Sequence, residues 1–227
     1  MNRRATSFSA ALVAGCCCLP PVVAQTSPPF TTEEREAIYT TTIDKRTRAI
    51  TELLSLSDAT KSNAVYQIIM GQYRALRARD AAVDAMLQSL DKDLPGVESN
   101  RTAVVQLLSK RLHGEFLAKL ANDLSPMQIE IVKDRMTYNK VQVTYSAYGE
   151  IVPGLTDKDK MMILDTLKVA REEAMDGGSA DEKSAIFQKY KEQINNRLGA
   201  GGYDVVKATQ EWEARQAAAK AASSRTQ

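Results

Sequence analysis

The sequence predicts an all-α protein, a multi-helix bundle of mostly antiparallel helices with a short irregular or extended segment rich in tyrosine. Short hydroxyl or amide side chains recur along the chain, and four of them, Thr31, Ser125, Thr156 and Ser179, are followed three positions later by an acid or a glutamine, which is the pattern of a helix N-terminal cap. Apolar residues then follow at helical spacing, and strand-like alternation is almost absent. Because the connections are short, successive helices are expected to pack antiparallel.

The predicted helices begin, in chain order, at Thr31, Ser57, Asn100, Ser125, Thr156, Ser179 and near Gly202. The first is expected to reach about residue 54 and the second about residue 90, where Pro95 and Gly96 end the hairpin connection. The fourth carries Pro126 at its first position and should reach about residue 137. The last helix is expected to decay after Trp212 into an alanine-rich tail, 216–227, that ends in disorder.

One segment departs from this helical pattern. Residues 138–148 are rich in tyrosine and β-branched side chains, and Val141 and Val143 alternate with polar neighbours. Such alternation is typical of a short extended piece. Tyr148 and Ile151 then indicate one or two helical turns before Pro153. The sequence therefore predicts an extended segment too short to form a sheet.

The first 24 residues are expected to be a secretory signal peptide. Arg3 and Arg4 precede an apolar stretch that prolines break just before Ala24, where we expect cleavage. The mature chain would then comprise a linker, 25–31, a single helical domain, 32–215, and the tail, and it would contain none of the three cysteines. We therefore expect a periplasmic or secreted protein. As a minority alternative, the residues before Cys16 resemble a lipobox, which predicts a lipoprotein acylated at that cysteine.

The composition excludes several classes of function. Thirty basic and twenty-eight acidic side chains leave a formal net charge of +2, too little for a protein that neutralises nucleic-acid phosphates. One histidine cannot supply a multi-imidazole metal site or, without a nucleophile motif, a catalytic triad. We expect no nucleic-acid partner, no metal, no cofactor and, unless Cys16 is acylated, no membrane contact after signal cleavage.

Charged side chains interrupt several predicted apolar faces. Arg171 falls within the apolar face of its helix, Lys183 and Lys191 fall within the face of the next helix, and Asn195 lies at its edge. In the long second helix, Asp80 lies among apolar residues. An unpaired buried charge costs several kcal/mol, so these groups should meet one another or line a water-filled pocket.

Two interpretations of these charges stay open. The first is a buried ion-pair cluster that fixes the register of the helices, and the second is a polar pocket for an anionic or polyhydroxylated ligand. Under either, Arg171 is expected to be buried and bound to a carboxylate. Asp80 is the first choice of partner because it lies similarly on the longest helix, and Asp204 or Asp176 is the second.

Specific strings run through the second half of the chain. They are Ala-Arg-Glu at 170–172, Ala-Met-Asp at 174–176, residues 179–183, Lys-Tyr-Lys at 189–191 after Phe187, Ile-Asn-Asn at 194–196 and Gly-Tyr-Asp at 202–204, with Val-Lys-Asp at 132–134 and Met-Thr-Tyr at 136–138 as a middle motif. Together they resemble a family of exported bacterial proteins catalogued as a domain of unknown function, over about residues 32–215. The resemblance implies a helical exported protein, often found in bacteria that degrade plant and algal polysaccharides, with no established reaction. Because its motif residues coincide with the interrupting charges, Arg171, Lys191 and Asn195 are predicted to form a shared centre.

These observations predict an exported carbohydrate-associated binding or accessory protein with a polar, tyrosine-rich pocket near the turn at 176–179. Its partner would be a glycan or another polar small ligand. Tyrosine and tryptophan rings would stack on sugar rings, and amide, acidic and basic groups would bind hydroxyls. The candidate ligand-binding residues are Lys133, Asp134, Tyr138, Arg171, Asp176, Lys183, Lys189, Tyr190, Lys191, Asn195, Asn196, Tyr203, Asp204 and Trp212.

The sequence leaves two alternative functions open. As an enzyme acting on acidic glycans, the protein would use Lys191, with its pKa lowered beside Arg171, as a base and Tyr190 as an acid. As a chaperone, it would use a pattern at Leu124, Ser125 and Gln128 that is similar to the Leu-Thr-x-x-Gln repeats of small periplasmic chaperones. A chaperone would also need an exposed apolar concave face.

Overall fold

The computed structural model describes residues 30–88 and 96–223, and within them it contains helices and no strand. The helices are α1 (Thr32–Leu53), α2 (Ala59–Gln88), α3 (Val97–Ala121), α4 (Pro126–Met136), α5 (Lys140–Ile151), α6 (Asp157–Met175), α7 (Ala180–Ala200) and α8 (Val205–Ser223). The predicted all-α class is therefore confirmed. The predicted signal peptide, Cys16, most of the linker, Pro95 and the last four residues of the tail lie outside the described residues.

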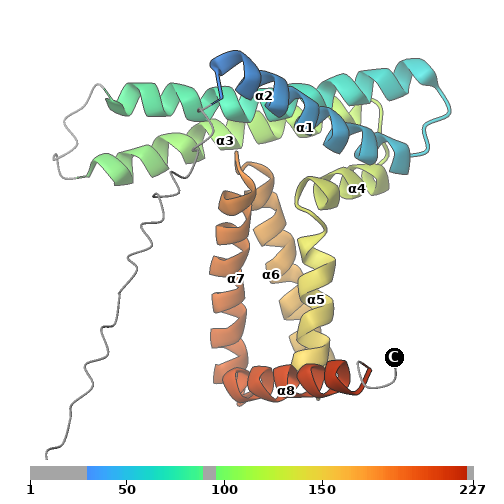
Figure 1. The fold of residues 1–227 in the computed structure, drawn as a ribbon, viewed down its shortest axis with the longest axis vertical. Helices are drawn as coiled ribbons and strands as arrows, with labels where there is room; N and C mark the ends of the chain where they lie inside the picture. The colour runs from blue at the N-terminus through green and yellow to red at the C-terminus, as the bar shows by residue number, and fades with distance from the viewer. Residues whose placement is uncertain (1–29, 89–95, 224–227) are drawn as a thin grey trace, which may run out of the picture.

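The helices form the two arms of a T (Figure 1). Helices α1–α4 make up the crossbar, in which α2 packs against both α1 and α3. Helices α5–α8 make up the stem, in which α6 packs between α5 and α7, and α8 lies across the far end. Between α4 and α5 the chain passes from crossbar to stem, and the turn between α6 and α7 returns to the crossbar.

Buried apolar side chains divide into two clusters that correspond to these arms. The crossbar cluster is built from α1–α4 around Ile69, Phe116 and Leu120, and the stem cluster is built from α5–α8 around Leu167 and Ile194. Met175, the last residue of α6, is 1% exposed and belongs to the crossbar cluster. The end of α6 is therefore inserted into the apolar core of the other arm.

Several predicted caps are present as expected. Thr31, Ser125 and Thr156 each accept a hydrogen bond from the backbone three residues on, and the side chain of that later residue returns to the cap backbone. Ser179 accepts from the amide of Glu182. Each such cap satisfies backbone donors that have no partner inside the helix, which is why the local sequence determines these helix starts.

Two predicted helix starts are wrong. Helix α2 begins after Asp58, whose carboxylate accepts from the amides of residues 60 and 61, so Ser57 is not its cap. Helix α3 begins at Val97, with Asn100 inside it, because Gly96 turns the chain with a φ of 89°. A left-handed glycine starts this helix without a side-chain cap, so the cap pattern does not detect it.

The predicted extended segment is also wrong, because helix α5 occupies residues 140–151. Val141, Tyr148 and Val152 are buried in the stem core, and Tyr145 packs against it, a spacing that fits one helical face. Burial of this face outweighs the strand propensity of tyrosine and valine. The irregular backbone is confined to the preceding turn, where Tyr138 and Asn139 both have positive φ, at 58° and 55°.

Substitution of Leu167 tests how much the stem core contributes to stability. Its side chain is 0% exposed, so Leu167→Ala should lower the free energy of unfolding by about 2–5 kcal/mol. Met161 lies on the same helix and is 64% exposed, so Met161→Ala should change that free energy by less than about 0.5 kcal/mol. Urea unfolding of both variants measures the difference, and equal losses would contradict the assignment of α6 to the core.

Candidate functional site

Arg171 lies buried where α6 of the stem meets α4 of the crossbar. Its guanidinium donates to Glu130 at 2.5 Å, to Asp134 at 2.6 Å and to Glu172 at 3.0 Å. The ammonium of Lys133 lies 3.3 Å from Glu130 and 3.0 Å from Glu172. The prediction that Arg171 is buried and bound to a carboxylate is confirmed, and the bonds link the two arms.

The predicted partners of Arg171 are wrong. Asp80 instead accepts from the neighbouring Arg79, at 2.7 and 2.9 Å. Asp176 faces His113, and Asp204 accepts from the amide of residue 207 at the start of α8. Helical periodicity identifies the face on which Arg171 lies, but it does not identify which helix packs on that face.

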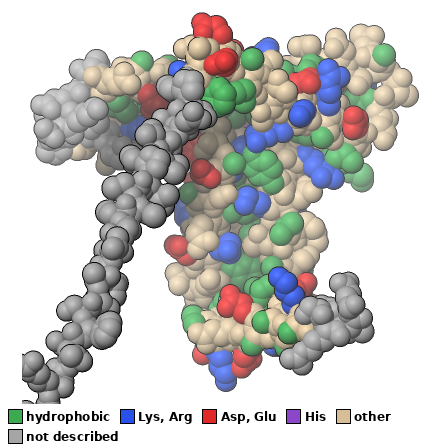
Figure 2. All heavy atoms as spheres, in the orientation of Figure 1, with side chains coloured by type: hydrophobic (Ala, Val, Ile, Leu, Met, Phe, Trp, Pro, Cys, Tyr) green, Lys and Arg blue, Asp and Glu red, His purple; other side chains and the backbone are tan. Residues whose placement is uncertain are grey.

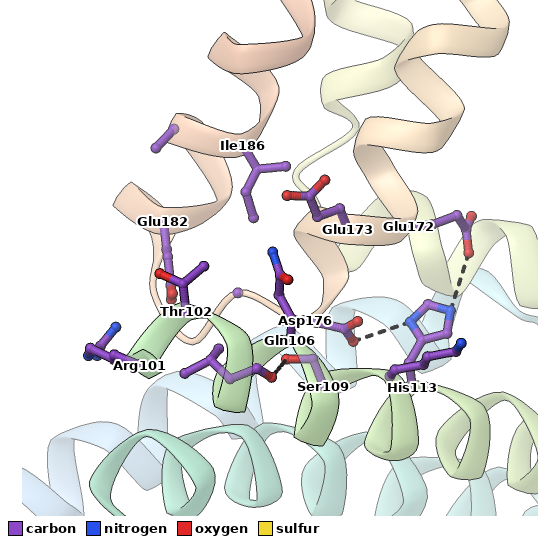
Figure 3. Close-up of a pocket in the computed structure, with 14 residues that line it drawn as sticks. Arg101, Thr102, Gln106, Ser109, His113, Glu172, Glu173, Asp176, Glu182 and Ile186 are labelled. Carbon is purple, nitrogen blue, oxygen red and sulfur yellow. Dashed lines mark hydrogen bonds and ion pairs between the residues drawn. The ribbon is translucent and has the colours of Figure 1, made fainter. Parts of the chain in front are cut away.

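His113 extends the charged contacts from α4 to α3. Its Nδ1 lies 3.2 Å from Asp176 and its Nε2 lies 3.5 Å from Glu172 (Figure 3). Hydrogen bonds to Asp176 and then Glu172 raise the pKa of His113 to about 9. Burial alone would raise the pKa of Glu172, but hydrogen bonds from His113, Lys133 and Arg171 lower it to about 2. We call the group of Glu130, Lys133, Asp134, Arg171, Glu172, His113 and Asp176 the junction network.

The turn between α6 and α7 is attached to α2 and α3 by a second set of contacts. Arg79 donates to the carbonyl of Asp176 and to the hydroxyl of Ser109, both at 2.7 Å. A Cβ on Gly178 would lie 2.0 Å from an Asp80 oxygen, so glycine permits this close approach. These contacts hold the turn against the crossbar.

Lys183 is a buried residue that stabilises the turn between α6 and α7. Its ammonium donates to the carbonyls of Ala174 and Met175, at 3.0 and 3.2 Å, and the residue is 2% exposed. Burial lowers the pKa of Lys183 to about 8. The side chain caps the C-terminal end of α6, where unpaired carbonyls attract a cation. Across the described residues, no buried side-chain nitrogen or oxygen lacks a partner, which favours a structural role for this group and for the junction network.

A cleft of about 470 Å³, the junction cleft, lies beside this network between α3 and the α6–α7 turn (Figure 3). It occupies the position predicted for a pocket, and Asp176 lines it. Its other lining residues are Arg101, Thr102, Val105, Gln106, Ser109, Lys110, His113, Glu172, Glu173, Gly177, Glu182, Ala185 and Ile186. Among these described wall residues there is no tyrosine, so the pocket is not the tyrosine-rich one that the sequence predicts.

A second hollow of about 690 Å³, the corner groove, lies at the turn between α7 and α8. Four of the predicted ligand-binding residues line it: Asn195, Asn196, Tyr203 and Asp204. The remaining lining residues are Gly199, Gly202, Val205, Val206, Thr209 and Gln210. The structure therefore brings these four predicted residues together, at the opposite end of α7 from the junction cleft.

The other predicted residues are distributed over several contacts. Lys189 and Tyr190 both bind Glu173, at 2.9 and 2.7 Å. The Trp212 indole lies 3.2 Å from a Glu150 oxygen, and Tyr138 lies under the guanidinium of Arg46. Lys191 is half-buried, and its backbone carbonyl accepts from Tyr148.

The predicted shared centre does not form. Arg171 contacts α4, whereas Asn195 accepts a hydrogen bond from Tyr148 of α5 at 2.7 Å. In the described part of the chain, no hydrogen bond or ion pair joins Arg171 to Lys191 or Asn195. The two sets of residues therefore belong to different parts of the stem.

Sequence reasoning missed Glu130 and Glu172 as members of the junction network. Their signal was present, because Glu130, Lys133 and Asp134 are spaced as neighbours on one helical face. Such a row of charges is usually exposed to solvent, and it gains meaning only when a buried arginine packs against it.

Comparison with known protein families identifies the family of this chain. The family described as "Protein of unknown function (DUF3826)" matches residues 40–218. This chain belongs to that family. No curated protein matches the sequence. The resemblance to a family of unknown function is therefore confirmed, and the family's description assigns no ligand or reaction.

Within residues 30–88 and 96–223, no helix has the length and apolar character needed to cross a membrane. The same residues contain no group of three or more histidine, cysteine, aspartate or glutamate side chains that could hold a metal ion.

The burial of Arg171 predicts a large effect on stability. Arg171→Met would leave three carboxylates without their shared cation, so it should lower the free energy of unfolding by about 3–5 kcal/mol. Arg111 forms an exposed pair with Glu115, with its side chain 80% exposed, so Arg111→Met should cost less than about 1 kcal/mol. Urea unfolding compares the variants, and a small loss for Arg171→Met would show that the network does not support the fold.

The raised pKa of His113 predicts a pH dependence. The folded protein holds the proton up to about pH 9, whereas the unfolded chain releases it near pH 6.5, so the stabilisation is complete below pH 6.5 and is lost as the pH rises through 9. The stability difference between the wild type and His113→Gln should therefore shrink over this range. Because the chain has one histidine, NMR titration of untagged protein reports its pKa directly. A midpoint near 6.5 in the folded protein would contradict the ion pairing.

Proposed function

We propose that this protein is an exported, carbohydrate-associated binding protein that takes a neutral glycan in the corner groove. The observation that carries the proposal is the lining of this groove, where Asn195, Asn196, Tyr203 and Asp204 lie together. Thr209 and Gln210 add two further polar side chains from α8. Among the described residues that line the groove, Asp204 alone carries a charge, so the lining favours an uncharged, hydroxyl-rich ligand.

The amide side chains suit the hydroxyl groups of a sugar. Each asparagine or glutamine amide both donates and accepts hydrogen bonds, as a hydroxyl does. Asn196 and Gln210 are exposed, so their amides can contact a ligand without any rearrangement of the protein. The apolar side chain of Val206, 70% exposed, supplies a surface for the C–H face of a sugar ring.

Two of the groove residues are held in place from behind. The hydroxyl of Tyr203 donates to Asp159 at 2.8 Å, which fixes the ring at the α7–α8 turn. The Asn195 oxygen accepts from Tyr148 at 2.7 Å, and this bond leaves the NH₂ group of Asn195 as its donor to a ligand. Groups fixed before binding lose less conformational entropy when the ligand arrives.

No specific observation favours the alternative functions. For an enzyme acting on acidic glycans, Lys191 would have to lie beside Arg171, but carboxylates of α4 and α6 surround that arginine. Burial, together with Glu173, raises the pKa of Tyr190 to about 12, which makes it a weaker acid near neutral pH.

For a chaperone, the exposed apolar side chains would have to form one concave face. They are instead spread over crossbar and stem, from Ile38 of α1 to Val206 of α8. On the face shown in Figure 2, apolar side chains appear in separate small patches among charged ones. This distribution gives the chaperone hypothesis no support.

A glycan screen of the purified protein tests the proposed function. Neutral oligosaccharides of glucose, xylose and mannose, and acidic oligosaccharides of uronates, would be compared by array binding and thermal stabilisation. We expect a neutral glycan to bind and to raise the melting temperature without being consumed. Formation of an unsaturated product from a uronate would instead indicate a lyase, and a folded protein that binds none of these glycans would overturn the proposal.

Variants of the corner groove locate the binding site. Asn196→Ala and Gln210→Ala should each weaken binding of the glycan identified by the screen by about tenfold, because each removes a ligand hydrogen bond from an exposed position. Each should change the free energy of unfolding by less than about 0.5 kcal/mol. Gln193→Ala, on the same helix but outside the groove lining, is the matched control and should bind normally. Equal binding by all three variants would place the glycan elsewhere.

A further inference from the structure

The junction cleft has two walls of opposite charge. One wall is a single face of α3, since its lining positions from Arg101 to His113 recur at helical spacing. The other wall is formed by the last turn of α6, the α6–α7 turn and the first turns of α7, which face α3 across the cleft in Figure 3. Among the described lining residues, every charged side chain on α3 is basic and every charged side chain opposite is acidic.

The basic wall presents Lys110 to the cleft. Lys110 is an exposed residue of α3 and lies between Arg101, which pairs with Asp84 at 3.0 Å, and His113, which pairs with acidic groups. The ammonium of a lysine has three donors on a flexible stem. Lys110 is therefore the basic group best placed to bind an anion inside the cleft.

The acidic wall presents Asp176 and Glu182. Asp176 uses one oxygen toward His113, and Glu182 uses one toward the amide of Gly178, at 2.7 Å. A carboxylate offers about four lone-pair positions, so each of these groups keeps capacity for another donor. Two carboxylates at one side of a cleft form a receptor for a cation such as an ammonium.

At one end of the cleft, a basic group of one wall already pairs with an acidic group of the other. There His113 and Asp176 lie 3.2 Å apart, and the pair closes that end (Figure 3). Along the rest of the cleft the walls are separated by a volume of about 470 Å³, which lies within the range of small-molecule sites. A ligand that pairs with both walls must therefore carry a negative group for the basic wall and a positive group for the acidic wall.

We propose that the junction cleft binds a small zwitterion with a free ammonium and a free carboxylate, such as an amino acid or a short peptide. The ammonium binds Asp176 and Glu182, and the carboxylate binds Lys110. Val105 and Ile186, also in the lining, provide apolar contact for the side chain of the ligand. A ligand with one charge would leave one wall uncompensated and meet like charge on the other. This inference does not rest on the proposed glycan site.

Three chemically matched probes test the proposal by calorimetry on the whole protein: alanyl-leucine, its N-acetyl derivative and its C-terminal amide. The N-acetyl form lacks the ammonium and the amide lacks the carboxylate. We expect the free dipeptide to bind and each blocked form to bind about tenfold more weakly or not at all. Equal affinity for the free and blocked forms, or no binding of any probe by folded protein, would overturn the proposal.

Two variants assign the two ends of the ligand. Lys110→Gln should weaken binding of the free dipeptide about tenfold and remove its advantage over the C-terminal amide. Glu182→Gln keeps an acceptor for Gly178 but loses the charge, so it should remove the advantage of the free dipeptide over the N-acetyl form. Lys119→Gln, on α3 but outside the cleft, is the control and should bind as the wild type does. Unchanged selectivity in both cleft variants would contradict the assignment.

Discussion

The arrangement of the two arms depends on the burial of Arg171 between carboxylates from two helices. A guanidinium removed from water must be surrounded by acceptors, and Glu130 and Asp134 of α4 provide them on the crossbar side. This requirement fixes α6 against α4. Met175, one turn further along α6, then enters the crossbar core, and the following turn comes to lie under α2 and α3. The junction cleft exists because α6 is held in this position.

A short segment of α6 contacts several neighbouring helices, because the side chains of successive helical residues point in directions about 100° apart. Arg171 faces α4, and Glu172 connects Arg171 with Lys133 and His113. Glu173 faces α7, where it binds Lys189 and Tyr190. The strings at 170–176 and 132–134, which carry the resemblance to the family, thus have a structural role in this protein. The residues that line the corner groove, in contrast, lie outside this network.

The helices could be predicted from the sequence to the extent that their ends are decided locally. The caps at Thr31, Ser125 and Thr156 depend on bonds between residues three apart, and the local pattern identifies them. Helix α5 could not be identified in this way, because burial of Val141 and Tyr148 against the stem decides its structure. The partner of Arg171 likewise depends on which helix packs against α6. Periodicity assigned that arginine to the interior, but the identity of the carboxylates is a property of the tertiary fold.

The two hollows lie at opposite ends of α7, a helix of 21 residues that is about 30 Å long. Glu182 and Ile186 face the junction cleft from its first turns, whereas Asn195 and Asn196 line the corner groove near its end. The corner groove is built from the stem alone, so its geometry does not depend on the angle between the arms. The junction cleft has one wall on each arm, and its width changes whenever the stem moves relative to the crossbar. A ligand that contacts both walls would add its own bonds to those of Arg171 and His113, and would stabilise the arrangement of the arms in which it binds.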